Sequence, residues 1–168
     1  MTADVLNRPL TPADLPRVSR LHATVFGPGR FTRTAYRVRE GTAPVSPYCR
    51  AAFLDERMFA AVRFTPITIG GVGGALLLGP LAVDPEFAGN GYGRALIGQS
   101  IDAAKAAGVR LVVLVGDEPY YGRFGFRVVP PGQIALPGPV NPARILAAEL
   151  SPDALSVYRG LVAAERAG

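Results

Sequence analysis

The chain has 168 residues, of which 49% are hydrophobic and one is a cysteine, and its formal net charge is +5. These values predict a single globular domain over residues 1–168 and exclude a disordered chain or an internal disulfide, so we expect a protein of the reducing cytoplasm. The basic residues are scattered, no apolar run reaches bilayer length, and no signal-peptide pattern opens the chain, which argues against nucleic-acid partners, membrane partners and secretion.

The first half of the chain is predicted to contain a strand, two helical stretches and a hairpin. Thr11 suits the cap of a helix and Pro12 its first turn, where proline costs no hydrogen bond. Apolar residues then recur at helical spacing on one face, which also holds the single histidine, His22. In order, we expect a strand at Val5–Arg8, a helix from Thr11 to about Phe26, a helical stretch at Thr32–Arg39 and a hairpin of Tyr48–Leu54 with Met58–Ile69.

The second half alternates strands and helices around a central apolar strand. Leu111–Val115 is an unbroken apolar run, which suits a strand buried on both faces. In order, we expect a flexible connection at Gly70–Gly74, a central strand at Ala75–Val83, a helix at Tyr92–Ala107, strands at Leu111–Val115, Phe126–Val129 and Ile145–Leu150, a loop at Pro130–Pro142 and a last helix capped by Ser151–Asp153.

A proline interrupts the central strand at Gly79-Pro80. Proline donates no hydrogen bond to a sheet and is therefore confined to edge strands and bulges. A strand as apolar as Ala75–Val83 is not suited to an exposed edge, which leaves a bulge as the better interpretation. We therefore expect this strand to bend away from Leu111–Val115 beyond Pro80.

Three glycines stand at alternate positions between the central strand and the next helix: Gly89, Gly91 and Gly93. Their missing side chains allow a ligand to approach the backbone. The loop leads into a helix start, where free N–H groups and the positive end of the helix dipole favour an anion. The sequence therefore predicts a site for a phosphate-bearing ligand.

Two well-known phosphate-binding loops fit these residues poorly. A P-loop ends in Gly-Lys-Ser/Thr, whereas Arg94 and Ala95 follow Gly93. A dinucleotide-binding fingerprint follows its strand directly and would need a third glycine at the position of Arg94. A glycine-rich turn that serves only chain reversal stays an alternative.

A second motif, GDEPYYGRFGF, occupies Gly116–Phe126 and follows the apolar run Leu111–Val115. Together with Ala88–Gly93 it resembles the GNAT N-acetyltransferases, which have a pyrophosphate loop Q/R-x-x-G-x-G/A and, further on, a tyrosine before an apolar residue, Gly and Phe. Tyr121 falls on that tyrosine. Ala88 departs from the pattern, because the usual Gln or Arg is absent there and one phosphate contact is lost; Arg94 and Asn90 are the candidates to replace it.

The resemblance implies an α/β fold (an α+β mixed sheet), in which a central, mostly antiparallel sheet contains a parallel pair of splayed strands and has helices on both faces. It implies acetyl-CoA as co-substrate, no metal, and direct attack of an amine of a small molecule or protein on the thioester. The implied cofactor-binding residues lie on the central strand and the glycine loop: Leu81, Ala82, Val83, Ala88, Gly89, Asn90, Gly91, Tyr92, Gly93 and Arg94.

The resemblance also implies that Tyr121 protonates the departing thiolate, with packing against the adenine side of the cofactor or against the core as the alternative role. The residue that would deprotonate the amine is not evident, because Ala75–Val83 contains no carboxylate. His22 suits packing better than chemistry, since it lies on the apolar face of its helix. Asp117 and Glu118 are placed to orient the tyrosine segment.

Two other classes of function stay open. A non-catalytic acyl-CoA-binding module would explain the missing base, and a nucleotide-binding protein could use the same glycine loop. Cys49 is interpreted as a small apolar residue rather than a nucleophile. The amine substrate and the oligomeric state, monomer or homodimer, are not determined by the sequence.

Overall fold

The structure is a computed structural model that describes residues 4–27, 38, 43 and 45–165. Its strands form one mixed sheet in the order β1-β2-β3-β4-β5-β8-β6, and β9 and β7 extend it beyond one end of β3. Only the β4–β5 and β7–β9 pairs are parallel among the described strands. The strands are β1 (Val5–Pro9), β2 (Arg50–Leu54), β3 (Arg57–Ile69), β4 (Val72–Val83), β5 (Leu111–Val115), β6 (Arg127–Val128), β7 (Ile134–Ala135), β8 (Ile145–Glu149) and β9 (Gly160–Ala164).

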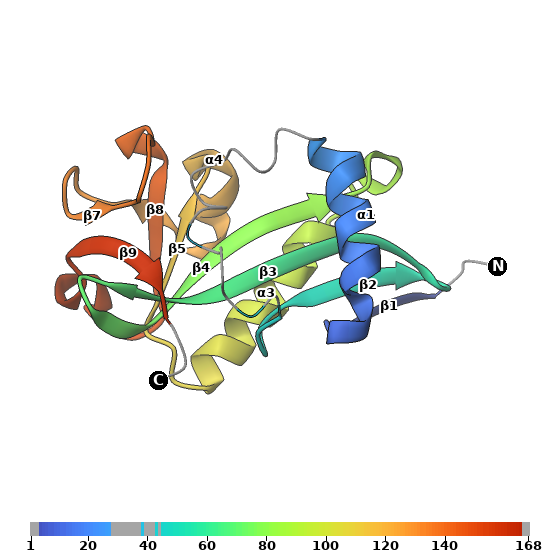
Figure 1. The fold of residues 1–168 in the computed structure, drawn as a ribbon, viewed down its shortest axis with the longest axis horizontal. Coiled ribbons are helices and arrows are strands. Elements are labelled where there is room, and N and C mark those ends of the chain that lie inside the picture. The colour runs from blue at the N-terminus through green and yellow to red at the C-terminus, as the bar shows by residue number, and fades with distance from the viewer. Residues whose placement is uncertain (1–3, 28–37, 39–42, 44, 166–168) are drawn as a thin grey trace.

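Helices cover both faces of this sheet, as Figure 1 shows, with α1 (Leu15–Phe26) in front and α3 (Tyr92–Ala106) behind. Val18 and Leu21 of α1 are buried in one apolar cluster with Met58 and Ala82. Leu96 and Ile97 of α3 belong to the opposite cluster. The mixed sheet with helices on both faces that the sequence predicts is confirmed. A short helix, α4 (Glu118–Tyr121), follows β5.

The central strand β4 contains the predicted bulge. Leu78 pairs with Phe64 of β3 and Leu81 pairs with Val62, so that Gly79 and Pro80 together stand opposite one residue, Arg63. Two residues opposite one is the defining count of a β-bulge. The bulge expected from the proline is therefore confirmed.

The strands β4 and β5 part slightly earlier than expected, before the bulge rather than beyond Pro80. Their parallel pairing joins Ala75–Leu77 to Leu111–Val113 and ends there. Beyond it, β5 continues to pair with β8 only, while β4 continues to pair with β3 up to Val83. The backbone edge of Leu81–Val83 that faces β5 thus has no strand partner among the described residues.

Several boundaries differ from the sequence-based expectations. The connection expected at Gly70–Gly74 is a tight turn at Gly70 and Gly71, both with positive φ, and β4 begins at Val72. Such a two-residue turn joins hairpin strands directly. The loop expected at Pro130–Pro142 contains the short strand β7. The helical stretch expected at Thr32–Arg39 lies outside the described residues, apart from the buried Val38.

The last helix expected after Ser151–Asp153 is wrong. Asp153 has a left-handed backbone, φ +58°, and begins a single 3₁₀ turn at Ala154–Val157. Gly160, at φ +125°, then opens strand β9, which pairs with Ile67–Ile69 of β3. The free end of a long strand offers backbone partners for a whole strand, and this segment adds β structure there instead of a helix.

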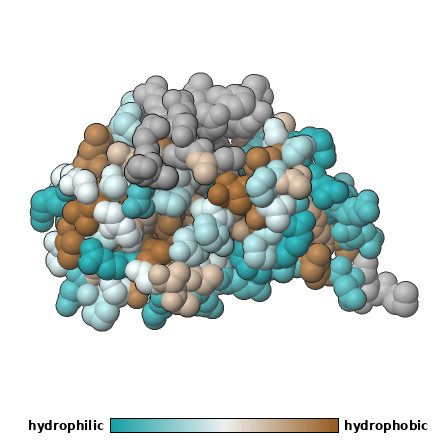
Figure 2. Space-filling model, turned by 60° about the horizontal axis from the view of Figure 1, so that its bottom comes forward, coloured by the Kyte–Doolittle hydropathy of each residue, from teal (hydrophilic) through white to brown (hydrophobic). Residues whose placement is uncertain are grey.

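Surface hydrophobic side chains are interspersed with hydrophilic ones on the face drawn in Figure 2. The large ones with substantial exposure are Val5, Leu6, Val128, Val157 and Leu161, and most of them lie on the outer strands β1, β6 and β9. Within the described ranges, no helix is both long enough and apolar enough to cross a membrane.

Candidate active site

The glycine loop between β4 and α3 begins with a braced segment. Asp84 accepts a hydrogen bond from the N–H of Glu86, and the Arg57 guanidinium pairs with both Asp84 (2.9 Å) and Glu86 (3.1 Å). The N–H bond and the Arg57 charge lower the pKa of Asp84. The ring of Phe87 stacks on Phe59 with centroids 4.1 Å apart, so that the start of the loop is attached to β3 at two points.

The three glycines of the loop have different roles. Gly89 and Gly91 both have φ near +81°, and a Cβ on either would meet open space. They permit the turn and leave the outer side of the loop free. Gly93 is buried, and a Cβ there would contact the Tyr120 hydroxyl at 3.4 Å and the side chains of Leu81 and Val83. The absent side chain of Gly93 therefore allows α3 to lie close to β4 and α4.

The start of α3 offers unpaired backbone donors. Gly91 occupies the cap position without a side chain to satisfy them, and the first backbone bond of the helix is donated by Ala95 to the Gly91 carbonyl. The N–H groups of Tyr92, Gly93 and Arg94 thus have no helical acceptor. Since the helix dipole adds positive potential at the same point, this end of α3 is suited to an anion.

The side chains of the remaining loop residues differ in how many contacts they already make within the protein. The Asn90 side-chain amide donates to the carbonyls of Phe87 and Ala88 and so closes the loop internally. The ring of Tyr92 packs edge-on against Phe59. Arg94 is exposed on the first turn of α3. Asn90 and Arg94 are the two candidates to replace the Gln or Arg that is missing at position 88. Of these, Arg94 is the one whose side chain stays available for a ligand.

Leu81, Ala82 and Val83 lie on the part of β4 that has left β5. Ala82 is buried against the α1 face, whereas Leu81 and Val83 pack toward α3. Their side chains are apolar and their free backbone edge points into the space between the parted strands. An amide-bearing ligand could pair with this edge as an added strand does.

Tyr121 lies at the end of α4 and packs against the same apolar cluster as Leu81 and Val83. Its ring packs on Gly116, where a Cβ would come 2.6 Å from the ring, and against Tyr120 and Phe126 at centroid distances of 4.8 Å and 6.0 Å. Burial, with smaller contributions from Tyr120 and Asp117, raises the pKa of Tyr121 to about 12. The hydroxyl is therefore protonated at neutral pH. Sequence reasoning missed Gly116, although a glycine directly after a buried strand was a usable signal.

The acidic residues beside Tyr121 hold its segment in place. Glu118 accepts a hydrogen bond from the N–H of Val128 at 3.0 Å, and Asp117 pairs with Arg144 at 3.4 Å. These two contacts join the tyrosine segment to β6 and to the residue before β8. His22 packs against Phe26 within α1, with ring centroids 5.7 Å apart. Cys49 is buried, and its sulfur accepts from the N–H groups of Ser46 and Phe64, which fits a packing role.

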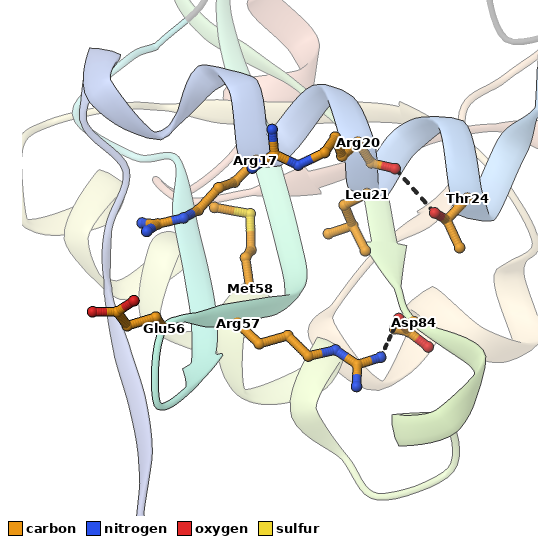
Figure 3. A pocket seen from close by; sticks show the side chains of 8 residues that line it. All are labelled: Arg17, Arg20, Leu21, Thr24, Glu56, Arg57, Met58 and Asp84. Atoms are coloured by element: carbon orange, nitrogen blue, oxygen red, sulfur yellow. Dashed lines mark hydrogen bonds and ion pairs between the residues drawn. The ribbon is translucent and has the colours of Figure 1, made fainter.

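A pocket of about 230 Å³ lies on the α1 side of the braced segment. Figure 3 shows Leu21 and Met58 between the arginines of α1 and the Arg57–Asp84 pair. The sequence did not point to this pocket, because its lining comes from three separate elements: Arg17, Arg20, Leu21, Thr24, Glu56, Arg57, Met58 and Asp84. No group of three or more His, Cys, Asp or Glu side chains suited to a metal ion occurs among the described residues.

Similarity to known proteins agrees with this geometry. Residues 7–129 match the family described as acetyltransferase (GNAT) domain. The Escherichia coli protein named uncharacterized N-acetyltransferase YhbS is 32% identical over 113 residues, which cover 64% of this chain and 65% of that protein. The matched region thus spans slightly less than two thirds of the curated relative.

Solved structures share the fold over nearly the whole chain. The crystal structure of the Escherichia coli GNAT family N-acetyltransferase YhbS in complex with CoA has a TM-score of 0.82 and 27% identity, covering 100% of this chain and 96% of that one. A GNAT family acetyltransferase from Brucella melitensis in complex with acetyl-CoA has a TM-score of 0.73 and 26% identity, covering 98% and 97%. The family match, the bulged and parted strand β4, and the glycine loop at the start of α3 together identify this chain as a member of the GNAT acetyltransferase family.

Proposed function

We propose that this protein is an N-acetyltransferase, one domain over residues 1–168, that transfers the acetyl group of acetyl-CoA to a primary amine of a small molecule or protein. The observation that carries the proposal is the parting of β4 from β5 directly before the glycine loop. A free strand edge that is followed by a glycine loop and a helix start matches a ligand with an amide-bearing arm and a diphosphate. The CoA and acetyl-CoA complexes of the two similar structures support the same ligand.

The proposed reaction is a direct transfer. The amine nitrogen attacks the thioester carbonyl carbon, the carbon–sulfur bond breaks, and the thiolate of CoA leaves. Positioning of the two substrates in line supplies much of the rate enhancement, since it removes the entropy cost of their encounter. In this proposal the backbone N–H groups of Leu81–Val83 polarise the carbonyl, and the Tyr121 hydroxyl donates its proton to the departing sulfur. The proton lost by the amine restores the phenol through solvent.

A second candidate function is a non-catalytic acyl-CoA-binding module. It is favoured by the composition of β4, which contains no carboxylate to deprotonate the amine. The parted strand edge and the glycine loop would serve such a module equally well. Only turnover separates it from the enzyme.

Two measurements test these functions. In a thermal-shift comparison, acetyl-CoA should raise the melting temperature, whereas NAD and ATP at the same concentration should not, because only a ligand of the native state stabilises it. Stabilisation by NAD or ATP alone would favour the nucleotide-binding alternative. Release of free thiol from acetyl-CoA, measured across a panel of primary amines, should then rise with at least one amine; binding without release in the whole panel would favour the module.

A further inference from the structure

An exposed arginine, Arg123, is held on an aromatic ring beside the glycine loop. Its guanidinium carbon lies 4.9 Å from the centroid of the Tyr120 ring. The hydroxyl at the far end of that ring reaches the start of α3, where a Cβ on Gly93 would lie 3.4 Å from it. The Tyr120 ring therefore bridges from α4 to the helix start, with Arg123 stacked on its face.

The glycine loop itself is short of positive charge. Ala88 stands where the resembled pattern has Gln or Arg, and the Asn90 amide is committed to loop carbonyls. Arg94 and the free N–H groups of α3 remain for a diphosphate at the helix start. Acetyl-CoA carries a further phosphate on the 3′ position of its ribose, which those groups do not serve when they hold the diphosphate.

We propose that Arg123 binds the 3′-phosphate of the cofactor and so makes the protein selective for CoA over 3′-dephospho-CoA. The inference rests on the proposed function, since it assumes a CoA thioester in the slot between β4 and β5. An arginine matches a phosphate with two parallel N–H donors. Stacking on Tyr120 fixes the orientation of the Arg123 guanidinium before the phosphate binds, so less conformational entropy is lost on binding.

Tyr120 acts in this site as a positioning residue. Its ring is itself held edge-on by Tyr121 at 4.8 Å and by Phe124 at 6.3 Å. These ring contacts give Tyr120 a structural role in α4. Tyr120 affects ligand binding through its contacts with Gly93 and Arg123. Removal of its ring would leave the Arg123 guanidinium without the surface that holds it in place.

Calorimetric titration with CoA and 3′-dephospho-CoA tests the inference on the full chain. The unchanged protein should bind CoA about tenfold or more tightly than 3′-dephospho-CoA, the preference expected of one charge-assisted contact. Arg123→Gln should lose about tenfold in affinity for CoA and less than twofold for 3′-dephospho-CoA. Tyr120→Leu should lose affinity for CoA by a smaller factor in the same selective way. Arg159→Gln removes an equal charge from the exposed turn before β9 and should change neither affinity.

Every other outcome overturns the inference in a distinct way. An equal loss for both ligands in Arg123→Gln would assign the arginine to the diphosphate. Unchanged affinities in Arg123→Gln would remove it from the site, and thermal unfolding of each variant checks that the fold is retained. If the unchanged protein bound neither ligand, the proposed function would fail as a whole; tight binding of both with equal affinity would leave that function standing and refute the 3′-phosphate contact alone.

Discussion

At the scale of single residues, the chemistry of the candidate site depends on Tyr121. Burial raises its pKa to about 12, whereas a thiol has a reference pKa of about 8.5. Complete proton transfer from this phenol to a free thiolate is therefore uphill. The proton donation that we propose for Tyr121 therefore requires its hydroxyl to lie within hydrogen-bond distance of the sulfur as the carbon–sulfur bond breaks.

Tyr121→Phe should retain the packing of the ring on Gly116 and remove only the proton. We expect the turnover rate to fall by about 10²-fold with little change in acetyl-CoA affinity, the pattern of an interaction made mainly in the transition state. Because the pKa of Tyr121 is about 12, its ionisation should also cause no loss of activity between pH 7 and about 10. Steady-state rates with a fixed amine, together with calorimetry, provide the comparison.

The matched control is Tyr48→Phe, which removes the hydroxyl of another partly buried tyrosine, one that precedes β2. It should have the rate of the unchanged protein. A normal rate in Tyr121→Phe would make Tyr121 a packing residue and leave the thiolate to be protonated by solvent.

At the scale of elements, the connection between β4 and α3 combines a rigid beginning with an open end. The segment Asp84–Phe87 is tied to β3 by Arg57 and by the stacked Phe59 ring. The following glycines expose backbone donors at the helix start. The rigid beginning fixes where those donors point, which is the preorganisation that anion binding requires.

Gly91→Val should obstruct the approach of the pyrophosphate to the backbone. A Cβ at Gly91 would project into open space rather than into the protein, so the side chain would occupy the ligand's position. We expect acetyl-CoA affinity to fall by tenfold or more, about 1.4 kcal/mol or above. Calorimetry measures the affinity.

Backbone strain from the new valine needs its own control. Gly108, two residues beyond the end of α3, has φ +89° and equally open surroundings. Gly108→Val should lower the melting temperature about as much as Gly91→Val while leaving acetyl-CoA affinity unchanged. An equal affinity in both variants would remove the glycine loop from the site.

Arg57→Gln should loosen the beginning of the loop without touching the ligand. An exposed ion pair contributes little to stability, so we expect the KM for acetyl-CoA to rise by less than about fivefold and kcat to stay unchanged. Arg17→Gln serves as control, because Arg17 lines the same pocket but has no ion pair with the loop. A fall in kcat for Arg57→Gln would place Arg57 closer to the chemistry than the structure does.

At the scale of the whole molecule, stability depends on how the first strand is joined to the first helix. Asp14 receives two hydrogen bonds from Arg8, both 2.8 Å, and one from the N–H of Thr11. The carboxylate is buried, and the Arg8 hydrogen bonds hold its pKa far below the ordinary value of 3.8. Edge strand β1 is therefore tied to the start of α1 by a charged group.

Asp14→Asn should lower the free energy of unfolding by about 1–3 kcal/mol at neutral pH, the range for a buried hydrogen-bonded group that loses its partner. Because the pKa is lower in the folded state, the stabilisation is complete above the ordinary pKa of 3.8 and is lost as the pH falls through the folded value. Urea unfolding from pH 7 to pH 3 should show the difference between the two proteins shrinking only below about pH 4. A constant difference down to pH 3 would assign the loss to packing instead.

Much of this fold could be predicted from local sequence patterns. Pro80 in an apolar strand predicted the bulge, because proline has no backbone N–H to donate to a neighbouring strand of the sheet. The apolar run Leu111–Val115 predicted β5 at the bounds observed. The strand β9 was missed because Asp153 resembles a helix cap in sequence, and the partners of that segment, β3 and β7, are brought to it only by the fold.

The sequence by itself determined the local parts of the candidate site: a glycine loop, a helix start without a side-chain cap, and a bulged strand. Each depends on backbone preferences of neighbouring residues, which are readable without the fold. The tertiary structure decided which distant side chains meet there. Arg57 reaches the loop across a hairpin, Gly116 makes room for the Tyr121 ring, and the Tyr120 hydroxyl approaches Gly93 at the start of α3. The Arg57–Asp84 and Gly93–Tyr120 contacts each join residues 27 positions apart in the chain, and no local preference encodes them.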